Sequence, residues 1–200
     1  RIAGHLLEAA DADIEFQAGK FAVAGTDRSV SLIDVAKTAY VPTKLPPEIE
    51  PGLDETAQYL PRVPTFPNGC HMCEIEIDPE TGKVEVMDYV VVDDVGTVLN
   101  PLLLKGQIHG GVAQGLGQAL MEEIRFDPES GQLLTGSFMD YALPRAGDLP
   151  AIEVESNAVP TKSNPLGAKG AGEAGTVGAL PTVMNAVLNA LAPLGVREIP

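Results

Sequence analysis

The sequence is most informative about its fold at Glu74-Ile-Glu-Ile-Asp-Pro-Glu-Thr-Gly-Lys-Val-Glu-Val86. Polar and apolar residues alternate on both sides of the central Asp-Pro-Glu-Thr-Gly, and such alternation is typical of half-buried strands. Asp, Pro and Gly are residues that tight turns favour. We therefore predict a β-hairpin here, with a second strand that continues into the apolar run Val90–Val92.

The same turn pattern recurs at Asp127-Pro-Glu-Ser-Gly131. Short apolar segments, Ile124–Phe126 and Gln132–Leu134, flank it and predict a second hairpin. Two copies are too few to indicate a repeat architecture.

Between the two turns, residues 100–123 have an apolar residue at every fourth position, which predicts an amphipathic helix. The apolar positions are Ile108, Val112, Leu116 and Leu120. The segment also contains five glycines, and each interior glycine costs about 1 kcal/mol relative to alanine. We expect another backbone or a ligand to lie against this helix.

The N-terminal part predicts a helix over residues 2–12, a hairpin centred on Gly19 and a helix over residues 29–40. Ser29 or Ser31 is the expected N-cap of the latter helix. The helical pattern starts at the first residue with no N-cap before it, so we expect the chain to begin inside a larger protein.

Towards the C-terminus, residues 152–156 predict a strand and residues 164–175 a glycine-rich loop. A helix is expected from Thr176 to about Leu191, with Pro181 near its first turn, where proline is tolerated. Its expected apolar side contains Val177, Leu180, Val183, Met184, Val187, Leu188 and Leu191.

Helices mixed with hairpins indicate an α+β fold. We expect three regions. Residues 1–45 form a helix–hairpin–helix portion, residues 46–69 a proline-rich ordered loop, and residues 70–200 the portion that holds the glycine-rich loop. The high proline density excludes long regular elements from the middle region.

The composition excludes several classes of function. A net charge of -15 argues against binding to nucleic acids or anionic membranes, which need a basic face. No uninterrupted apolar stretch approaches the roughly 20 residues of a membrane span. Two cysteines do not make a disulfide framework, so we expect a reducing, cytoplasmic location.

Cys70 and Cys73 form a Cys-X-X-Cys pair with His71 between them. A structural zinc site needs four ligands, and the remaining His5 and His109 have no paired spacing. We therefore predict that both cysteines are small buried hydrophobic residues rather than metal ligands.

The segment with the clearest chemical content is Gly167-Ala-Lys-Gly-Ala-Gly-Glu-Ala-Gly175. Its glycines permit close approach of a ligand to the backbone, and the helix that follows offers free N–H groups. From these residues alone, Glu173 is best interpreted as an acidic residue at a helix start. The loop matches neither the P-loop nor the dinucleotide-binding spacing.

Three ordered segments resemble the molybdopterin-binding subunits of the xanthine dehydrogenase, aldehyde oxidase and carbon monoxide dehydrogenase family. They are Val92-Asp-Asp-Val-Gly-Thr-Val-Leu-Asn-Pro101, Gly106-Gln-Ile-His-Gly-Gly-Val-Ala-Gln-Gly-Leu-Gly117 and Asn164-Pro-Leu-Gly-Ala-Lys-Gly-Ala-Gly-Glu-Ala-Gly175. The resemblance covers nearly the whole chain. It implies that the fold is the second half of the molybdenum-cofactor-binding domain of a molybdenum hydroxylase, near the end of the large subunit.

The resemblance also implies roles for individual residues. Glu173 would be the catalytic base that takes a proton from a molybdenum-bound hydroxide. Gln107 would donate a hydrogen bond beside the metal, and Gly172 would contribute a backbone N–H there. Without the resemblance, Gln107 is equally well a polar residue near a helix N-terminus.

Three more residues are expected to contact the cofactor. Asp94 and Asn100 match positions that hold the dinucleotide end in bacterial members, although Asp94 is also suited to a turn. Asn100 is also suited to capping a helix that starts at Pro101. Lys169 either supports Glu173, binds a phosphate or is solvated.

The implied cofactor is molybdenum with molybdopterin cytosine dinucleotide, with 2Fe–2S clusters and FAD on other domains or subunits. The implied partners are the rest of the molybdenum subunit, the iron–sulfur and flavin subunits, and a small-molecule substrate. Family subunits are several hundred residues longer, so the chain is either a fragment or a split subunit and is expected to be inactive alone. The competing hypotheses are an acidic scaffold or binding module and a phosphate-loop nucleotide binder.

Overall fold

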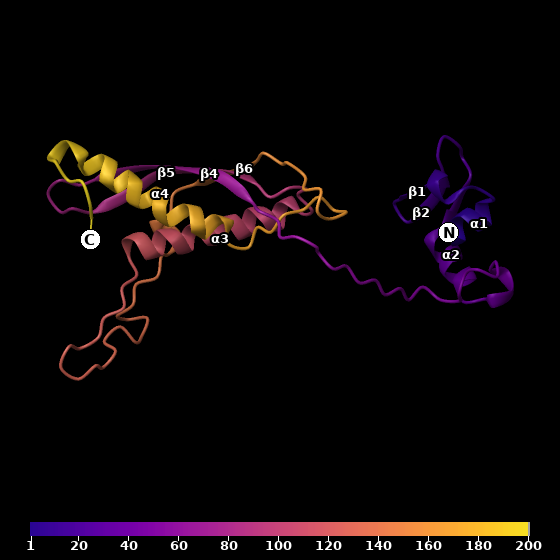
Figure 1. Cartoon of the computed structure of the whole chain (residues 1–200), viewed down its shortest axis with the longest axis horizontal. Coiled ribbons are helices and arrows are strands. Elements are labelled where there is room, and N and C mark those ends of the chain that lie inside the picture. Colours follow the sequence, from indigo (N-terminus) through magenta and orange to yellow (C-terminus); the bar gives the residue numbers. More distant parts are fainter. Residues whose placement is uncertain (200) are drawn as a thin grey trace. The chain divides into compact units, whose positions relative to one another are not determined.

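A computed structural model describes residues 1–199 and divides the chain into two compact units, Arg1–Leu60 and Pro61–Pro200. The division falls within the predicted proline-rich loop. Helices and small sheets are mixed in both units, so the α+β prediction is confirmed (Figure 1).

The N-terminal unit packs two short helices against a three-stranded antiparallel sheet in the order β1-β2-β3. The predicted hairpin is present, and its turn places Ala18 and Gly19 at positive φ, as a tight hairpin turn requires. The buried core contains Ile2, Ala3, Val35 and Ala39. The elements are α1 (Ile2–Leu7), η1 (Asp11–Asp13), β1 (Ile14–Gln17), β2 (Lys20–Val23), β3 (Ser29–Ser31), α2 (Leu32–Ala39) and η2 (Pro42–Lys44).

Both helices of this unit are shorter than predicted. The first ends at Leu7 because Glu8 adopts the left-handed conformation, φ 48° and ψ 49°, and its N–H bonds back to Gly4 and His5. The second begins at Leu32, and its N-cap is Ser31, whose hydroxyl accepts a hydrogen bond from the Asp34 N–H at 3.1 Å. Ser29 belongs to the preceding strand instead.

The C-terminal unit has a three-stranded sheet with two long helices along one face (Figure 1). The strand order is β4-β5-β6, antiparallel between β4 and β5 and parallel between β5 and β6. Buried residues from the sheet and both helices form the core: Tyr89, Val91, Ile108, Val112, Leu116, Ala179 and Val183. The elements are β4 (Asn68–Ile77), β5 (Val84–Asp94), α3 (Pro101–Leu120), η3 (Ala146–Asp148), β6 (Ile152–Ser156), α4 (Ala174–Leu191) and η4 (Ala192–Leu194).

The two predicted hairpin turns have different outcomes. The first joins β4 to β5, and the Asp78 carboxylate accepts hydrogen bonds from the Glu80 N–H and the Thr81 hydroxyl. The second turn closes in the same way around Asp127, but its flanks pair only through a single bridge between Phe126 and Leu133. An isolated two-stranded hairpin has little stability, and the strands predicted there do not form.

The expected close contact with the glycine-rich helix is present. A Cβ atom on Gly111 would lie 2.8 Å from the Thr176 nitrogen, and one on Gly115 would lie 2.5 Å from the Ala179 Cβ. The backbone of α4 therefore lies directly against α3. Gly106 and Gly110 are exposed and face no neighbouring atom within 4 Å among the described residues, so the helix keeps an open backbone surface near its N-terminus.

The last long helix differs from its prediction in two respects. It begins at Ala174, so Pro181 lies in its interior and not in its first turn, on the exposed side. Val177 and Leu180 are exposed, whereas Ala179, Val183 and Val187 are buried. The segment Ala174–Leu194 is long and apolar enough to span a membrane by length and composition alone. Its residues Ala179 and Val183 pack with α3 in the buried core.

Candidate functional site

The glycine-rich loop is fastened at its start to the end of β5. The Lys169 N–H bonds to the Val95 carbonyl at 2.8 Å, and the Thr97 N–H bonds to the Gly167 carbonyl at 2.9 Å. Gly167 has φ 68°, and a Cβ there would lie 2.8 Å from the Thr97 hydroxyl oxygen, so this position requires glycine. These contacts at Gly167 and Lys169 form an anchor that fixes the loop before it reaches Gly172.

Asp94 and Lys169 form a buried ion pair within this anchor. The Lys169 ammonium lies 2.5 Å from Asp94 Oδ2, and Asp94 Oδ1 accepts hydrogen bonds from the Gly96 and Val159 N–H groups at 2.8 and 3.0 Å. The hydrogen bond from Lys169, followed by those from Val159 and Gly96, lowers the pKa of Asp94 to about 2. Of the three alternatives for Lys169, solvation does not occur, because only 11% of its side chain is exposed.

Gln107 connects the open surface of α3 to the middle of the loop. Its side-chain amide donates a hydrogen bond to the Gly172 carbonyl at 2.7 Å, across 65 residues of sequence. Gln107 and Gly172 are both exposed. The structure therefore brings together two of the residues that the sequence singled out, on a surface that other atoms can reach.

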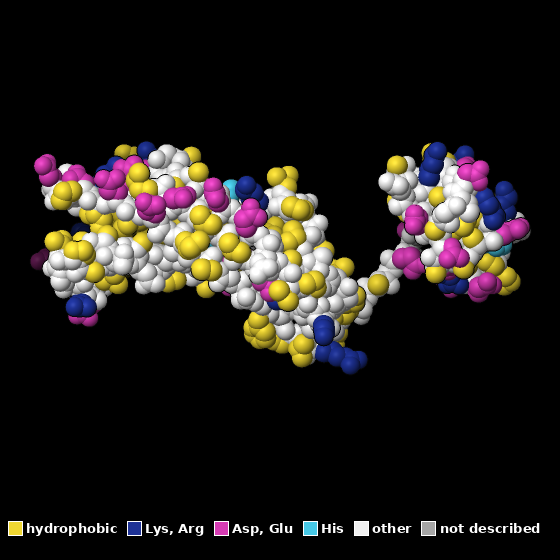
Figure 2. All heavy atoms as spheres, turned by 90° about the horizontal axis from the view of Figure 1, so that it is seen from above, with side chains coloured by type: hydrophobic (Ala, Val, Ile, Leu, Met, Phe, Trp, Pro, Cys, Tyr) yellow, Lys and Arg dark blue, Asp and Glu magenta, His cyan; other side chains and the backbone are white. Residues whose placement is uncertain are grey.

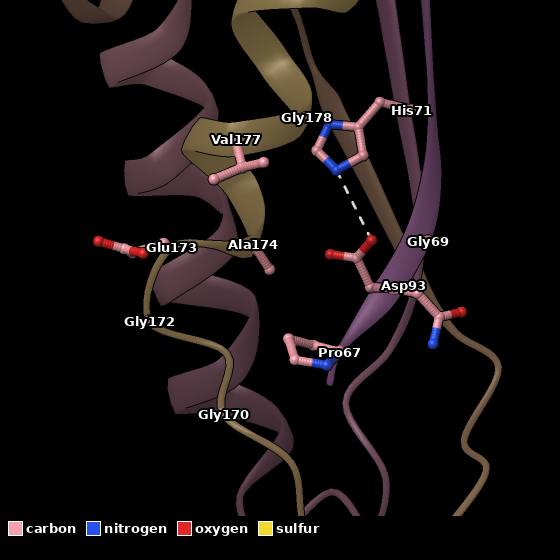
Figure 3. Close-up of a pocket in the computed structure, with 11 residues that line it drawn as sticks. Pro67, Gly69, His71, Asp93, Gly170, Gly172, Glu173, Ala174, Val177 and Gly178 are labelled. Atoms are coloured by element: carbon pink, nitrogen blue, oxygen red, sulfur yellow. Dashed lines mark ion pairs between the residues drawn. The ribbon is translucent and has the colours of Figure 1, made fainter. Parts of the chain in front are cut away.

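Glu173 follows at the N-cap of α4, but its side chain makes no capping hydrogen bond. The residue is exposed, and Figure 3 shows its carboxylate directed away from His71 and Asp93. Glu173 therefore lies at the helix start, as the sequence predicted, but its side chain does not cap the helix. Among the described residues, no hydrogen bond to this carboxylate is present, so it is available to a bound group.

Asn100 lies at the N-terminus of α3, the helix that carries Gln107. Its side chain caps α3 by accepting a hydrogen bond from the Leu103 N–H at 3.1 Å, and Pro101 is the first helical residue. The expected capping is confirmed. The residue is exposed, so its amide NH₂ can also reach a ligand.

A pocket of about 450 Å³ opens on the side of the Gly172–Ala174 backbone that faces away from the Glu173 carboxylate (Figure 3). Two of its residues, His71 and Asp93, were not identified from the sequence. His71 Nδ1 lies 2.9 Å from the Tyr89 hydroxyl, and His71 Nε2 lies 3.6 Å from Asp93 Oδ1. Tyr89, Val91 and Asp93 alternate onto one face of β5, but this spacing alone does not place His71, on β4, beside them. The pocket is lined by Pro67, Asn68, Gly69, His71, Asp93, Gly170, Gly172, Glu173, Ala174, Val177 and Gly178.

The two cysteines differ from their prediction. Both are free thiols, but Cys70 is exposed and only Cys73 is partly buried. Burial, and then the charge of Asp88, raises the pKa of Cys73 to about 11. Across residues 1–199, no group of three or more His, Cys, Asp or Glu side chains has an arrangement that could hold a metal ion.

Comparison with known proteins now identifies the family. The family model of the molybdopterin cofactor-binding domain matches residues 1–150. The chain belongs to the molybdopterin cofactor-binding domain family. The predicted resemblance is thereby confirmed.

The names of this chain's relatives refer to different molecules. It is 37% identical to the carbon monoxide dehydrogenase large chain of Hydrogenophaga pseudoflava, over 100% of this chain and 24% of that protein. It is 39% identical to the nicotine 6-hydroxylase large subunit of Paenarthrobacter nicotinovorans, over 97% of this chain and 24% of that protein. The crystal structure of quinoline 2-oxidoreductase from Pseudomonas putida 86 superposes with a TM-score of 0.86 at 40% identity, covering 98% of this chain and 25% of that chain.

The chain therefore spans about a quarter of the length of these relatives. Its own residues leave room for a bound group, because Gly106, Gly110, Gly170 and Gly172 have no neighbouring atom within 4 Å of a Cβ position among the described residues. Bare backbone of this kind permits close approach of a ring system. The Gln107 amide lies at the same surface.

Proposed function

We propose that the chain is part of a molybdenum hydroxylase that oxidises a C–H bond or carbon monoxide with oxygen derived from water, and that Glu173 is its general base. The supporting observation is the free, exposed Glu173 carboxylate, one residue after the Gly172 carbonyl that Gln107 holds. When bound, the molybdenum cofactor would supply the two-electron redox chemistry.

In this proposal Glu173 accepts a proton at a carboxylate oxygen. A general base must come within hydrogen-bond distance of the proton it removes. Glu173 lies at the N-cap of α4, and its exposed carboxylate makes no capping hydrogen bond, so a bound group can reach its oxygens.

Gln107 and Gly172 are proposed to hold the cofactor beside Glu173. The Gln107 amide has two N–H donors and can retain the Gly172 contact while the second donates to the bound group. Asn100 is proposed to bind the dinucleotide end with its amide NH₂. Asp94 and Lys169 are proposed to support the dinucleotide end indirectly. Their ion pair compensates both charges and fixes the start of the glycine-rich loop.

The cofactor is proposed to be molybdenum with molybdopterin cytosine dinucleotide, with 2Fe–2S and FAD on other domains or subunits. The rest of the molybdenum subunit is the proposed partner that completes the site. Exposed apolar side chains support a covering partner, and Figure 2 shows many hydrophobic side chains on the surface of the C-terminal unit. Exposed examples are Leu102 and Leu103 on α3 and Phe138 and Met139 in the segment of residues 121–149. Two free thiols support a reducing, cytoplasmic location.

Glu173→Gln in the full-length protein tests the base. We expect unchanged molybdenum and cytosine-nucleotide content and a loss of turnover of at least about a hundredfold, because removing a general base costs that much or more. Glu153→Gln, an exposed substitution of the same type on β6, is the control and should retain activity. Near wild-type turnover in Glu173→Gln would refute the role.

Cofactor analysis tests the wider proposal. Molybdenum and a released cytosine nucleotide in the purified protein would support it. Thermal stabilisation by ATP without molybdenum would favour a phosphate-loop nucleotide binder instead. Binding of neither would favour an acidic scaffold.

A further inference from the structure

The pocket under the Gly172–Ala174 backbone ends at a buried carboxylate oxygen with no partner. Only 6% of the Asp93 side chain is exposed, and Asp93 Oδ2 has no hydrogen-bond partner among the described residues. Figure 3 shows this oxygen directed toward Ala174 and the pocket, while the other oxygen faces His71. A buried acceptor left without a hydrogen bond costs about 1–3 kcal/mol, and more when it is charged. Such an atom indicates a ligand.

His71 approaches only the other oxygen of the Asp93 carboxylate. Its Nδ1 lies 2.9 Å from the Tyr89 hydroxyl, and its Nε2 lies 3.6 Å from Asp93 Oδ1, which is longer than a hydrogen bond. The ring therefore leaves Asp93 Oδ2 without a partner.

Asp93 Oδ2 has no partner among the described residues, in contrast to the carboxylate of the next residue. The adjacent Asp94 has Lys169 as its cation. No Lys or Arg side chain lines the pocket, and Glu173 on its rim is a second acid. A buried carboxylate is tolerated when a cation and hydrogen bonds compensate its charge.

We propose that this pocket binds an organic cation, an ammonium or guanidinium group, which donates a hydrogen bond to Asp93 Oδ2. The walls fit the hydrocarbon part of such a group, because Pro67, Ala174 and Val177 are apolar. Long cationic side chains and small alkylamines both combine an apolar stem with a charged head. The occupant is therefore either a Lys or Arg side chain from another part of the full-length protein or a free alkylammonium.

The site is separate from the proposed catalytic position. The Glu173 carboxylate points away from Asp93, and the backbone of the loop lies between them (Figure 3). The proposal does not depend on Glu173 acting as a base. Its test uses no turnover measurement, so the two proposals can fail independently.

The first arm of the test is a high-resolution crystal structure of the full-length purified protein. A Lys or Arg nitrogen within hydrogen-bond distance of Asp93 Oδ2 would establish the side chain as the source. If the pocket is open there, the second arm is calorimetric titration with propylammonium chloride, with propanol as the neutral probe of similar shape. We expect propylammonium to bind and propanol not to bind.

Asp93→Asn removes the charge while nearly preserving the shape, and it should weaken propylammonium binding by at least about tenfold, as expected for a buried charge pair. Asp88→Asn, at an exposed position on the same strand, is the control and should bind like the wild type. If Asp93→Asn does not fold, the comparison of propylammonium with propanol in the wild type still shows whether the pocket prefers a cation. An ordered water alone at Asp93 Oδ2, with equal responses to both probes, would overturn the proposal.

Discussion

Lys169 Nζ lies 2.5 Å from Asp94 Oδ2, and this pair joins the glycine-rich loop to the last residue of β5. Only 11% of the lysine side chain and 9% of the aspartate side chain are exposed, so little solvent competes for the contact. Breaking a buried pair leaves one uncompensated charge. The pair therefore determines where the loop begins, and the position of Glu173 depends on it indirectly.

The depressed pKa of Asp94 predicts a specific acid sensitivity. Its carboxyl has an ordinary pKa of 3.8 and a folded-state pKa of about 2. Its contribution to the free energy of unfolding is therefore full above pH 3.8 and is lost as the pH falls through 2. Urea unfolding of wild type and Asp94→Asn at several pH values should show the difference between them shrinking between pH 4 and pH 2. A difference that stays constant over this interval would contradict the assignment.

The packing of α3 against α4 predicts opposite effects at neighbouring glycines. Gly111→Ala should lower the free energy of unfolding by about 1–3 kcal/mol, because the new Cβ would lie 2.8 Å from the Thr176 nitrogen and 2.9 Å from the Gly175 Cα. Gly110→Ala is the control, because no atom lies within 4 Å of its Cβ position. It should stabilise the helix by about 0.5–1 kcal/mol. Equal effects in thermal unfolding would show that the two helices are not in close contact.

The features that could be predicted from the sequence are those that depend on local residues. The β4–β5 hairpin follows from alternation and turn chemistry, and the start of α3 follows from Asn100 and Pro101. The hairpin around Asp127 does not form strands, because its flanks lie outside the three-stranded sheet and lack a further strand for support. The early end of α1 depends on the left-handed conformation of Glu8, a residue type that gives no such signal.

In the candidate site, too, the residues within local motifs could be predicted, whereas those brought together by strand pairing could not. Glu173, Gln107 and Gly172 were found through three ordered motifs, and the structure brings Gln107 and Gly172 into contact. His71 and Asp93 were missed because their proximity depends on how two strands pair. The register places His71 opposite Val91, with Tyr89 and Asp93 two residues to either side of it. No spacing within one segment indicates this arrangement.

The unequal burial of the two cysteines predicts selective labelling. Cys70 is exposed, whereas Cys73 is partly buried with a pKa raised to about 11. At pH 8 only about one thousandth of Cys73 is then thiolate, which is the reactive form. Brief iodoacetamide treatment followed by mass spectrometry should find Cys70 modified first. Both thiols should react in urea, and preferential labelling of Cys73 in the folded protein would contradict the structure.

The hydrogen bond from Gln107 to Gly172 predicts local loosening of the loop when the amide is removed. Gln107→Leu should increase amide hydrogen exchange at residues 170–174, while the free energy of unfolding falls by only about 0.5–1.5 kcal/mol, the usual contribution of one hydrogen bond. Gln114→Leu, an equally exposed change on the same helix, should leave exchange in the loop unaltered. Unchanged exchange in Gln107→Leu would show that this hydrogen bond does not hold the loop. The Lys169–Asp94 pair and the packing of α4 against α3 would then position Glu173 without it.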